Sequence, residues 1–225
     1  MKIALYLSGQ VRNLHENQIW NPISTLFKGH EVDYYFHFWK EHEYTEEFIL
    51  DRIKPKNYVF EPQVSFTPQS KYIYKHLSGK KLSSPRLYFN MMSFYYSFAQ
   101  AKTIVPLDEY DLICKTRTDA YFFGGNLNRV LNAATKFILI TNTKVNPQQR
   151  LTDMCFLGNP KLFSKVLDVA ELATEPQKYI DDYQKRRNIR FTSHTYLSYA
   201  FEKHNIRYKQ VPMNLTLAKH RDKIS

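Results

Sequence analysis

The chain has 225 residues and a net charge of +11, from 32 Lys and Arg against 21 Asp and Glu. A hydrophobic fraction of 43% excludes a disordered chain, and the length suits a single domain. There are only six glycines, and they form neither G-x-G-x-x-G nor a Walker loop, which argues against dinucleotide-dependent dehydrogenases and P-loop kinases. Two cysteines are too few for a disulfide framework or a four-ligand zinc site. No apolar run is long enough for a membrane span or a signal-peptide core, so we expect a cytoplasmic protein.

Apolar runs typical of strands alternate with helical patterns along the chain. Strands are predicted where β-branched and aromatic residues gather, at residues 3–7, 32–39, 58–60, 110–115, 136–141, 153–157 and 206–211. Helices are predicted where apolar residues recur with helical spacing, at residues 11–20 with a restart to about 27, 46–53, 87–105, 161–173 and about 193–204. Residues 61–85 carry three prolines and a glycine, so we expect a loop there.

This alternation predicts an α/β fold with a mostly parallel central sheet flanked by helices, as one Rossmann-like domain over residues 1–225. The same domain could also be part of a longer polypeptide. Three predicted strands end in polar residues, at residues 8–10, around His37 and Trp39, and at residues 117–119. Because ligands bind at the carboxyl edge of parallel sheets, the sequence predicts a site where these three segments meet.

The segment 117–119 ends a hydrophobic strand with alternating charge. The Asp119 carboxylate suits a hard divalent cation that also takes phosphate oxygens, and the Arg117 guanidinium suits a diphosphate. The alternative is an ordinary Arg–Asp pair that caps the strand.

Residues Ser8, Gly9, Gln10 and Arg12 form a predicted strand-to-helix turn. Gly9 lets the backbone approach a ligand closely, and Arg12 adds positive charge for an anion. The alternative is a plain turn with a solvated arginine.

Two further residues could contact a substrate. His37, with Trp39 beside it, could hold a base or sugar ring, and Asp153 could act as a general base. The alternatives are a core histidine whose hydrogen bonds are satisfied, and a cap at the start of a strand.

Four segments in this order, at residues 7–13, 33–39, 90–97 and 110–119, resemble one known family. They are similar to GT-A-like glycosyltransferases of bacterial surface-polysaccharide and lipopolysaccharide synthesis, and to related enzymes of large DNA viruses. The matching blocks span roughly residues 3–123. The resemblance implies a hexosyltransferase that moves a sugar from a nucleotide-diphosphate donor, such as a UDP-sugar, to a glycan or glycoprotein. It also implies Mn²⁺ or Mg²⁺ as cofactor, in the cytoplasm of a bacterium or an infected host, with peripheral membrane contact as an option.

The resemblance also implies roles for individual residues. The donor would be bound by Ser8, Gly9, Gln10, Arg12, His37, Arg117 and Thr118. Asp119 would be the metal ligand at the place of a D-x-D motif, where Arg117 stands instead of the first acid. Asp153 and Arg117 would be catalytic, with Asp153 as the base of an inverting reaction.

Two other functions remain open at the level of sequence. The charge of +11 and the abundance of aromatics fit a nucleic-acid-binding module with the basic run at residues 185–190 as its footprint, although no nucleic-acid motif accompanies it. The other is a non-catalytic relative that binds glycans, which the replacement of the first acid by Arg117 keeps open.

Overall fold

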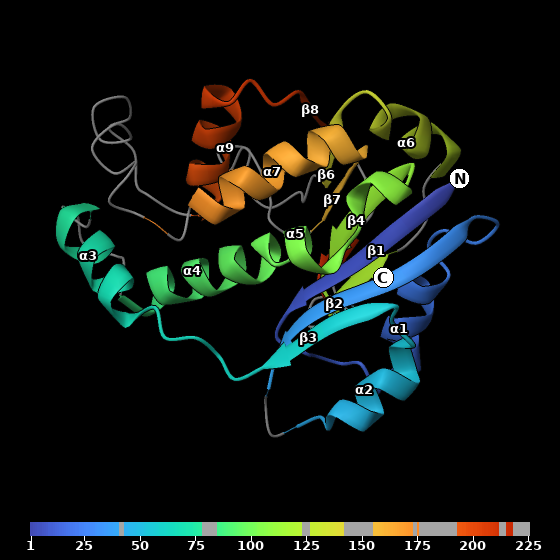
Figure 1. Ribbon diagram of the computed structural model, residues 1–225, viewed down its shortest axis with the longest axis horizontal. Coiled ribbons are helices and arrows are strands. Elements are labelled where there is room, and N and C mark those ends of the chain that lie inside the picture. Colours follow the sequence, from blue (N-terminus) through green and yellow to red (C-terminus); the bar gives the residue numbers. More distant parts are fainter. Residues whose placement is uncertain are drawn as a thin grey trace.

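The computed structural model of this protein describes residues 1–40, 43–77, 85–122, 127–141, 155–172, 175, 193–211 and 215–217 (Figure 1). Its strands are β1 (Lys2–Gly9), β2 (Glu31–Trp39), β3 (Asn57–Glu61), β4 (Leu112–Thr116), β5 (Ala120–Phe122), β6 (Ile138–Thr141), β7 (Phe156–Gly158), β8 (Tyr208–Val211) and β9 (Leu215–Leu217). Seven of them form one sheet in the order β3-β2-β1-β4-β7-β6-β8, and β5 pairs with β9 in a separate two-stranded ribbon.

The sheet is mostly parallel, as the sequence predicts. Strands β1, β2, β3 and β4 pair in parallel, whereas β7 is antiparallel to both of its neighbours, β4 and β6. The chain runs from β1 outward to β2 and β3 and then returns to β4 on the other side of β1. The strand order therefore reverses between β1 and β4, and in open α/β sheets ligands bind at the carboxyl end of such a switch point.

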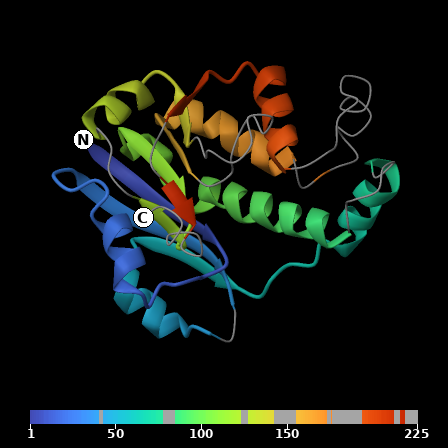
Figure 2. The ribbon, with the colours of Figure 1, turned by 180° about the vertical axis from the view of Figure 1, so that it is seen from behind.

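The helices lie on both faces of this sheet (Figures 1 and 2). They are α1 (Asn17–Ser24), α2 (Glu46–Ile53), α3 (Thr67–Leu77), α4 (Pro85–Ala99), α5 (Ala101–Ile104), α6 (Leu127–Ala134), α7 (Pro160–Leu172) and α9 (Ser193–Lys203), with a 3-10 turn η1 (Leu107–Glu109). Buried residues of α4, α5, α7 and α9 form one core, and those of α1, α2 and α6 form the other.

Successive side chains of strand β1 point alternately into the two cores. Ile3, Leu5 and Leu7 belong to the α1/α2 core, and Ala4 and Tyr6 belong to the α4/α7 core. All five are fully buried, which explains why this strand has a continuous apolar sequence rather than an alternating one.

Helix α4 runs alongside the sheet and forms one wall of the site described below. It begins at Pro85, and proline suits the first turn because it has no N–H to leave unpaired there. Its buried side chains recur with helical spacing and face the sheet: Tyr88, Met91, Met92, Tyr95 and Phe98.

Two predicted segments are wrong. The helix expected from residue 11 begins only at Asn17, because the chain first turns through Asn13, which has a left-handed backbone conformation (φ 55°). The helix then continues through Pro22, where a break was expected. The loop expected at 61–85 contains α3, since Pro68 stands in the first turn of that helix, where proline is tolerated, and Ile73 is fully buried.

Candidate functional site

The site begins where β1 ends. Gly9 has a φ of +107°, a conformation that L side chains rarely adopt, and it allows the chain to turn out of the sheet. The next apolar side chain, Val11, returns to the core with 1% exposure. Gln10 and Arg12 are thus left on the outer side of the turn, at the carboxyl edge of the sheet.

The turn after β1 is tied to the segment after β4. The Arg12 backbone N–H donates to Thr118 Oγ1 at 2.9 Å, and Thr118 Oγ1 donates to the Gln10 carbonyl at 3.5 Å. Thr118 is 1% exposed, so these bonds are shielded from water. The two segments that the sequence placed at one sheet edge are therefore held together by direct contacts.

Three charged side chains form what we call the arginine cluster: Arg12, Arg117 and Asp119. Arg117 binds the Asp119 carboxylate with two parallel hydrogen bonds, from Nε to Oδ1 and from Nη2 to Oδ2, both 2.8 Å long. Arg12 Nη1 lies 3.6 Å from Asp119 Oδ2, and a second Arg12 nitrogen donates to Gln10 Oε1. Burial raises the pKa of Asp119, but the hydrogen bonds and charge of Arg117 and the charge of Arg12 outweigh this, so its pKa is lowered. The cluster holds one negative and two positive charges.

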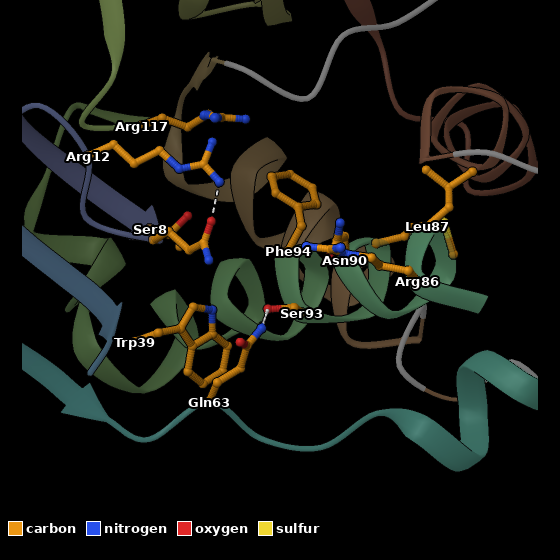
Figure 3. A pocket seen from close by; sticks show the side chains of 13 residues that line it. Ser8, Arg12, Trp39, Gln63, Arg86, Leu87, Asn90, Ser93, Phe94 and Arg117 are labelled. Atoms are coloured by element: carbon orange, nitrogen blue, oxygen red, sulfur yellow. Dashed lines mark hydrogen bonds between the residues drawn. The ribbon is translucent and has the colours of Figure 1, made fainter. Parts of the chain in front are cut away.

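The arginine cluster opens into a cavity of about 390 Å³. Figure 3 shows Arg12 and Arg117 on one wall and α4 residues Asn90, Ser93 and Phe94 opposite them. The cavity is lined by Ser8, Gly9, Gln10, Arg12, Trp39, Gln63, Arg86, Leu87, Asn90, Met91, Ser93, Phe94 and Arg117. These lining residues include three arginines and no Asp or Glu, so the cavity suits an anionic ligand.

A buried hydroxyl lies at the floor of the cavity. Ser8 is 4% exposed and lines the cavity, yet its Oγ has no hydrogen-bond partner among the described residues. The same holds for Thr116 Oγ1 at the end of the adjacent strand β4. Leaving a buried hydroxyl without a hydrogen bond costs about 1–3 kcal/mol in stability. A ligand or water that forms a hydrogen bond to Ser8 would remove this cost.

Trp39, at the end of β2, lines another side of the cavity and rests on a second polar group, which we call the histidine network: His37, Ser97 and Glu61. His37 Nδ1 lies 2.9 Å from Ser97 Oγ, and His37 Nε2 lies 2.9 Å from Glu61 Oε1. Trp39 packs against the edge of His37 with ring centroids 4.7 Å apart. Burial lowers the pKa of His37 and Glu61 only partly compensates, so the imidazole is neutral near pH 7. Neutral Nε2–H then donates to Glu61, and Nδ1 faces the Ser97 hydroxyl, which also donates to the His37 carbonyl at 3.2 Å.

The structure brings most of the predicted site residues together. Ser8, Gly9, Gln10, Arg12 and Arg117 line the cavity, and Thr118 and Asp119 support it from behind. His37 does not line it: its side chain is fully buried, and it bears on the cavity only through Trp39. Asp153 lies outside the described residues, as does the basic run at 185–190.

Sequence reasoning assigned no role to several lining residues. Gln63 follows β3 and donates from Nε2 to Ser93 Oγ at 2.9 Å, which joins the end of β3 to α4. Asn90 and Ser93 interrupt the apolar pattern of α4, and Phe94 lies between them and Arg117 (Figure 3). Polar residues within an otherwise apolar helix face are the signal that could have indicated this wall.

The described residues fit a divalent metal poorly. No group of three His, Cys, Asp or Glu side chains occurs among them, and both oxygens of Asp119 already accept hydrogen bonds from Arg117. In the described part of the chain, no helix is long and apolar enough to cross a membrane.

No protein-family model matches the sequence, and no curated protein matches it significantly. Among solved structures, mouse xyloside xylosyltransferase 1 has a TM-score of 0.48 and 13% identity, over 94% of this chain and 85% of that one. The glycosyltransferase GlyE of Streptococcus pneumoniae has a TM-score of 0.46 and 11% identity, and the match covers 93% of this chain but only 44% of GlyE. A protein assigned as a nucleotide-diphospho-sugar transferase from Desulfovibrio desulfuricans has a TM-score of 0.46 and 10% identity, over 93% and 79% of the two chains. All three names denote sugar transferases, but similarity at this level carries no argument about activity, which has to come from the site.

Proposed function

We propose that this protein is a GT-A-like glycosyltransferase that takes a hexose from a nucleotide-diphosphate sugar and transfers it to a hydroxyl of a glycan or glycoprotein in surface-glycan synthesis. The observation that carries this proposal is the cavity at the β1/β4 switch point. It combines Arg12 and Arg117 with the Ser8 hydroxyl, which has no partner among the described residues, and these groups suit a diphosphate.

The reaction makes one bond and breaks another. The bond between the sugar C1 and the β-phosphate oxygen breaks, and its electron pair stays on the diphosphate. The acceptor oxygen forms the new bond to C1 and loses its proton. Negative charge therefore grows on the leaving diphosphate, and fixed guanidinium groups aimed at it stabilise the transition state more than the ground state. Arg117 and Arg12 are the residues we assign to this task.

The rest of the cavity suits the neutral parts of the donor. Trp39 and Phe94 provide apolar ring faces or edges for a base or sugar ring. Gln10, Gln63, Asn90 and Ser93 provide amide and hydroxyl groups that can bind ring carbonyls or sugar hydroxyls. Polar and charged side chains outnumber the apolar ones in this lining, which suits a ligand as polar as a nucleotide sugar.

Asp153 is our proposed general base. In an inverting reaction a carboxylate takes the proton of the acceptor hydroxyl, and in a retaining reaction no separate base is required. A cytoplasmic location and contact with a membrane surface also stay predictions. The divalent metal expected on Asp119 from the sequence is the alternative that measurements with and without Mn²⁺ test.

The test is an assay of donor turnover. The protein is incubated with UDP-sugars and GDP-sugars, with and without Mn²⁺, and the release of nucleoside diphosphate is followed by chromatography. We expect slow release from one nucleotide class, since water can replace the acceptor, and loss of that release in Arg117→Gln. Release from no donor, together with salt-dependent binding to single-stranded nucleic acid, would instead support the nucleic-acid module.

A further inference from the structure

We propose that the arginine cluster binds the donor diphosphate without a divalent cation, with Arg117 and Arg12 supplying the positive charge and Asp119 acting as a positioning residue. This inference rests on the proposed function and specifies how the same site recognises its ligand.

The first argument is the occupancy of the Asp119 carboxylate. A hard divalent cation takes about six oxygen ligands and usually uses one or two carboxylates with substrate phosphates and water. Asp119 offers one carboxylate, and each of its oxygens accepts a 2.8 Å hydrogen bond from Arg117. A cation there would have to displace the Arg117 fork or lie beside two guanidinium groups of like charge.

The second argument is where the charges face. Arg12 and Arg117 line the cavity, whereas Asp119 does not and is only 6% exposed. The carboxylate therefore lies behind the guanidinium groups with respect to the cavity, and a ligand meets net positive charge first. A metal ligand has to face the substrate phosphates, and Asp119 faces the arginines.

The third argument is what Asp119 does for the two arginines. Two like charges repel, and a carboxylate between them reduces this repulsion and fixes the guanidinium planes. Arg117 lines the cavity while it holds the Asp119 carboxylate, so the orientation that this pair fixes also presents the guanidinium group to a ligand. Thr118 Oγ1 accepts a hydrogen bond from the Arg12 backbone N–H, so the turn that carries Arg12 and the segment that carries Arg117 are held together.

The experiment is a calorimetric titration of the wild-type protein with UDP and GDP, once in excess EDTA and once with Mn²⁺. We expect the dissociation constant of the nucleotide that binds to differ by less than about threefold between the two conditions. Binding that appears only with Mn²⁺ would overturn this inference and leave the proposed function intact. Binding under neither condition would overturn the proposed function itself.

Two variants, each measured once in EDTA and once with Mn²⁺, separate the roles within the cluster. Arg117→Gln should weaken nucleotide binding by about 10- to 100-fold, since it removes a charge-assisted hydrogen-bond donor. Asp119→Asn should weaken it by less than about tenfold and leave it insensitive to Mn²⁺. An Mn²⁺ effect that Asp119→Asn abolishes would identify Asp119 as a metal ligand instead. A larger loss in EDTA for Asp119→Asn than for Arg117→Gln would contradict the assignment of Asp119 as a positioning residue. Arg207→Gln is the matched control, because Arg207 is exposed and precedes β8 at the opposite edge of the sheet.

Discussion

The two polar groups at the carboxyl edge of this sheet differ in what they face. The arginine cluster holds two positive charges and one negative charge, and the two arginines line the cavity. The histidine network lies under Trp39, its His37 is fully buried, and each ring nitrogen has a partner within the protein. A polar group that is satisfied internally maintains the shape of the site, whereas a group with surplus charge toward a cavity binds a ligand. Variants in the two groups should therefore affect different measurements.

The largest effect is expected for Trp39→Ala, and it is an effect on stability. Trp39 is 1% exposed and contacts both the His37 ring and the Tyr96 ring, which is stacked on it with centroids 5.6 Å apart. Removing such a buried ring costs about 3–5 kcal/mol in the free energy of unfolding, measurable by urea denaturation. Phe48→Ala is the control: Phe48 is 39% exposed and should change stability by less than about 1 kcal/mol. Equal losses in the two variants would mean that Trp39 is not a structural support of the site.

The next effect is the pH dependence of stability. Burial lowers the folded-state pKa of His37 below the ordinary histidine value of 6.5, against the opposing effect of Glu61, so the unfolded chain binds more protons there. Stability should therefore fall as the pH drops below about 6.5, by at most about 1.4 kcal/mol per pH unit for this group. His37→Gln should remove that part of the pH dependence, as followed by denaturant midpoints between pH 5 and 8. The same slope in the variant would contradict the assignment of a buried neutral imidazole.

The smallest effect is also the most specific to the cavity. Ser8→Ala removes a buried hydroxyl with no partner among the described residues, so the free energy of unfolding should stay the same or rise by up to about 1 kcal/mol. Nucleotide binding should weaken by about three- to tenfold, because the ligand loses a hydrogen bond.

Ser70→Ala is the matched control for Ser8→Ala. The Ser70 hydroxyl is equally buried but donates to the Thr67 carbonyl at 3.0 Å, so its removal should lower stability without affecting binding. A loss of stability in Ser8→Ala with unchanged affinity would show that the hydroxyl serves the fold alone.

The parts of this molecule that could be predicted from sequence are those with local signals. Strand β1 is a continuous apolar run, and helix α4 has apolar residues at helical spacing. Because β1 and β4 are parallel, residues 8–12 and 117–119 follow them at the same edge of the sheet. The α3 helix was missed because Pro68 reads as a breaker when the buried positions of the helix are unknown. The α4 wall and the role of His37 depend on how α4 packs against the sheet, and no local pattern encodes that contact.

The central claim is that the cavity between β1, β4 and α4 binds a nucleotide-diphosphate sugar through its arginines. The most direct measurement is a calorimetric titration of the wild type, Arg117→Gln and Arg207→Gln with UDP, GDP and their sugar derivatives. The account predicts that one nucleotide class binds the wild type and Arg207→Gln with the same affinity, and binds Arg117→Gln about 10- to 100-fold more weakly. Binding of no nucleotide, or equal binding to all three proteins, would contradict it.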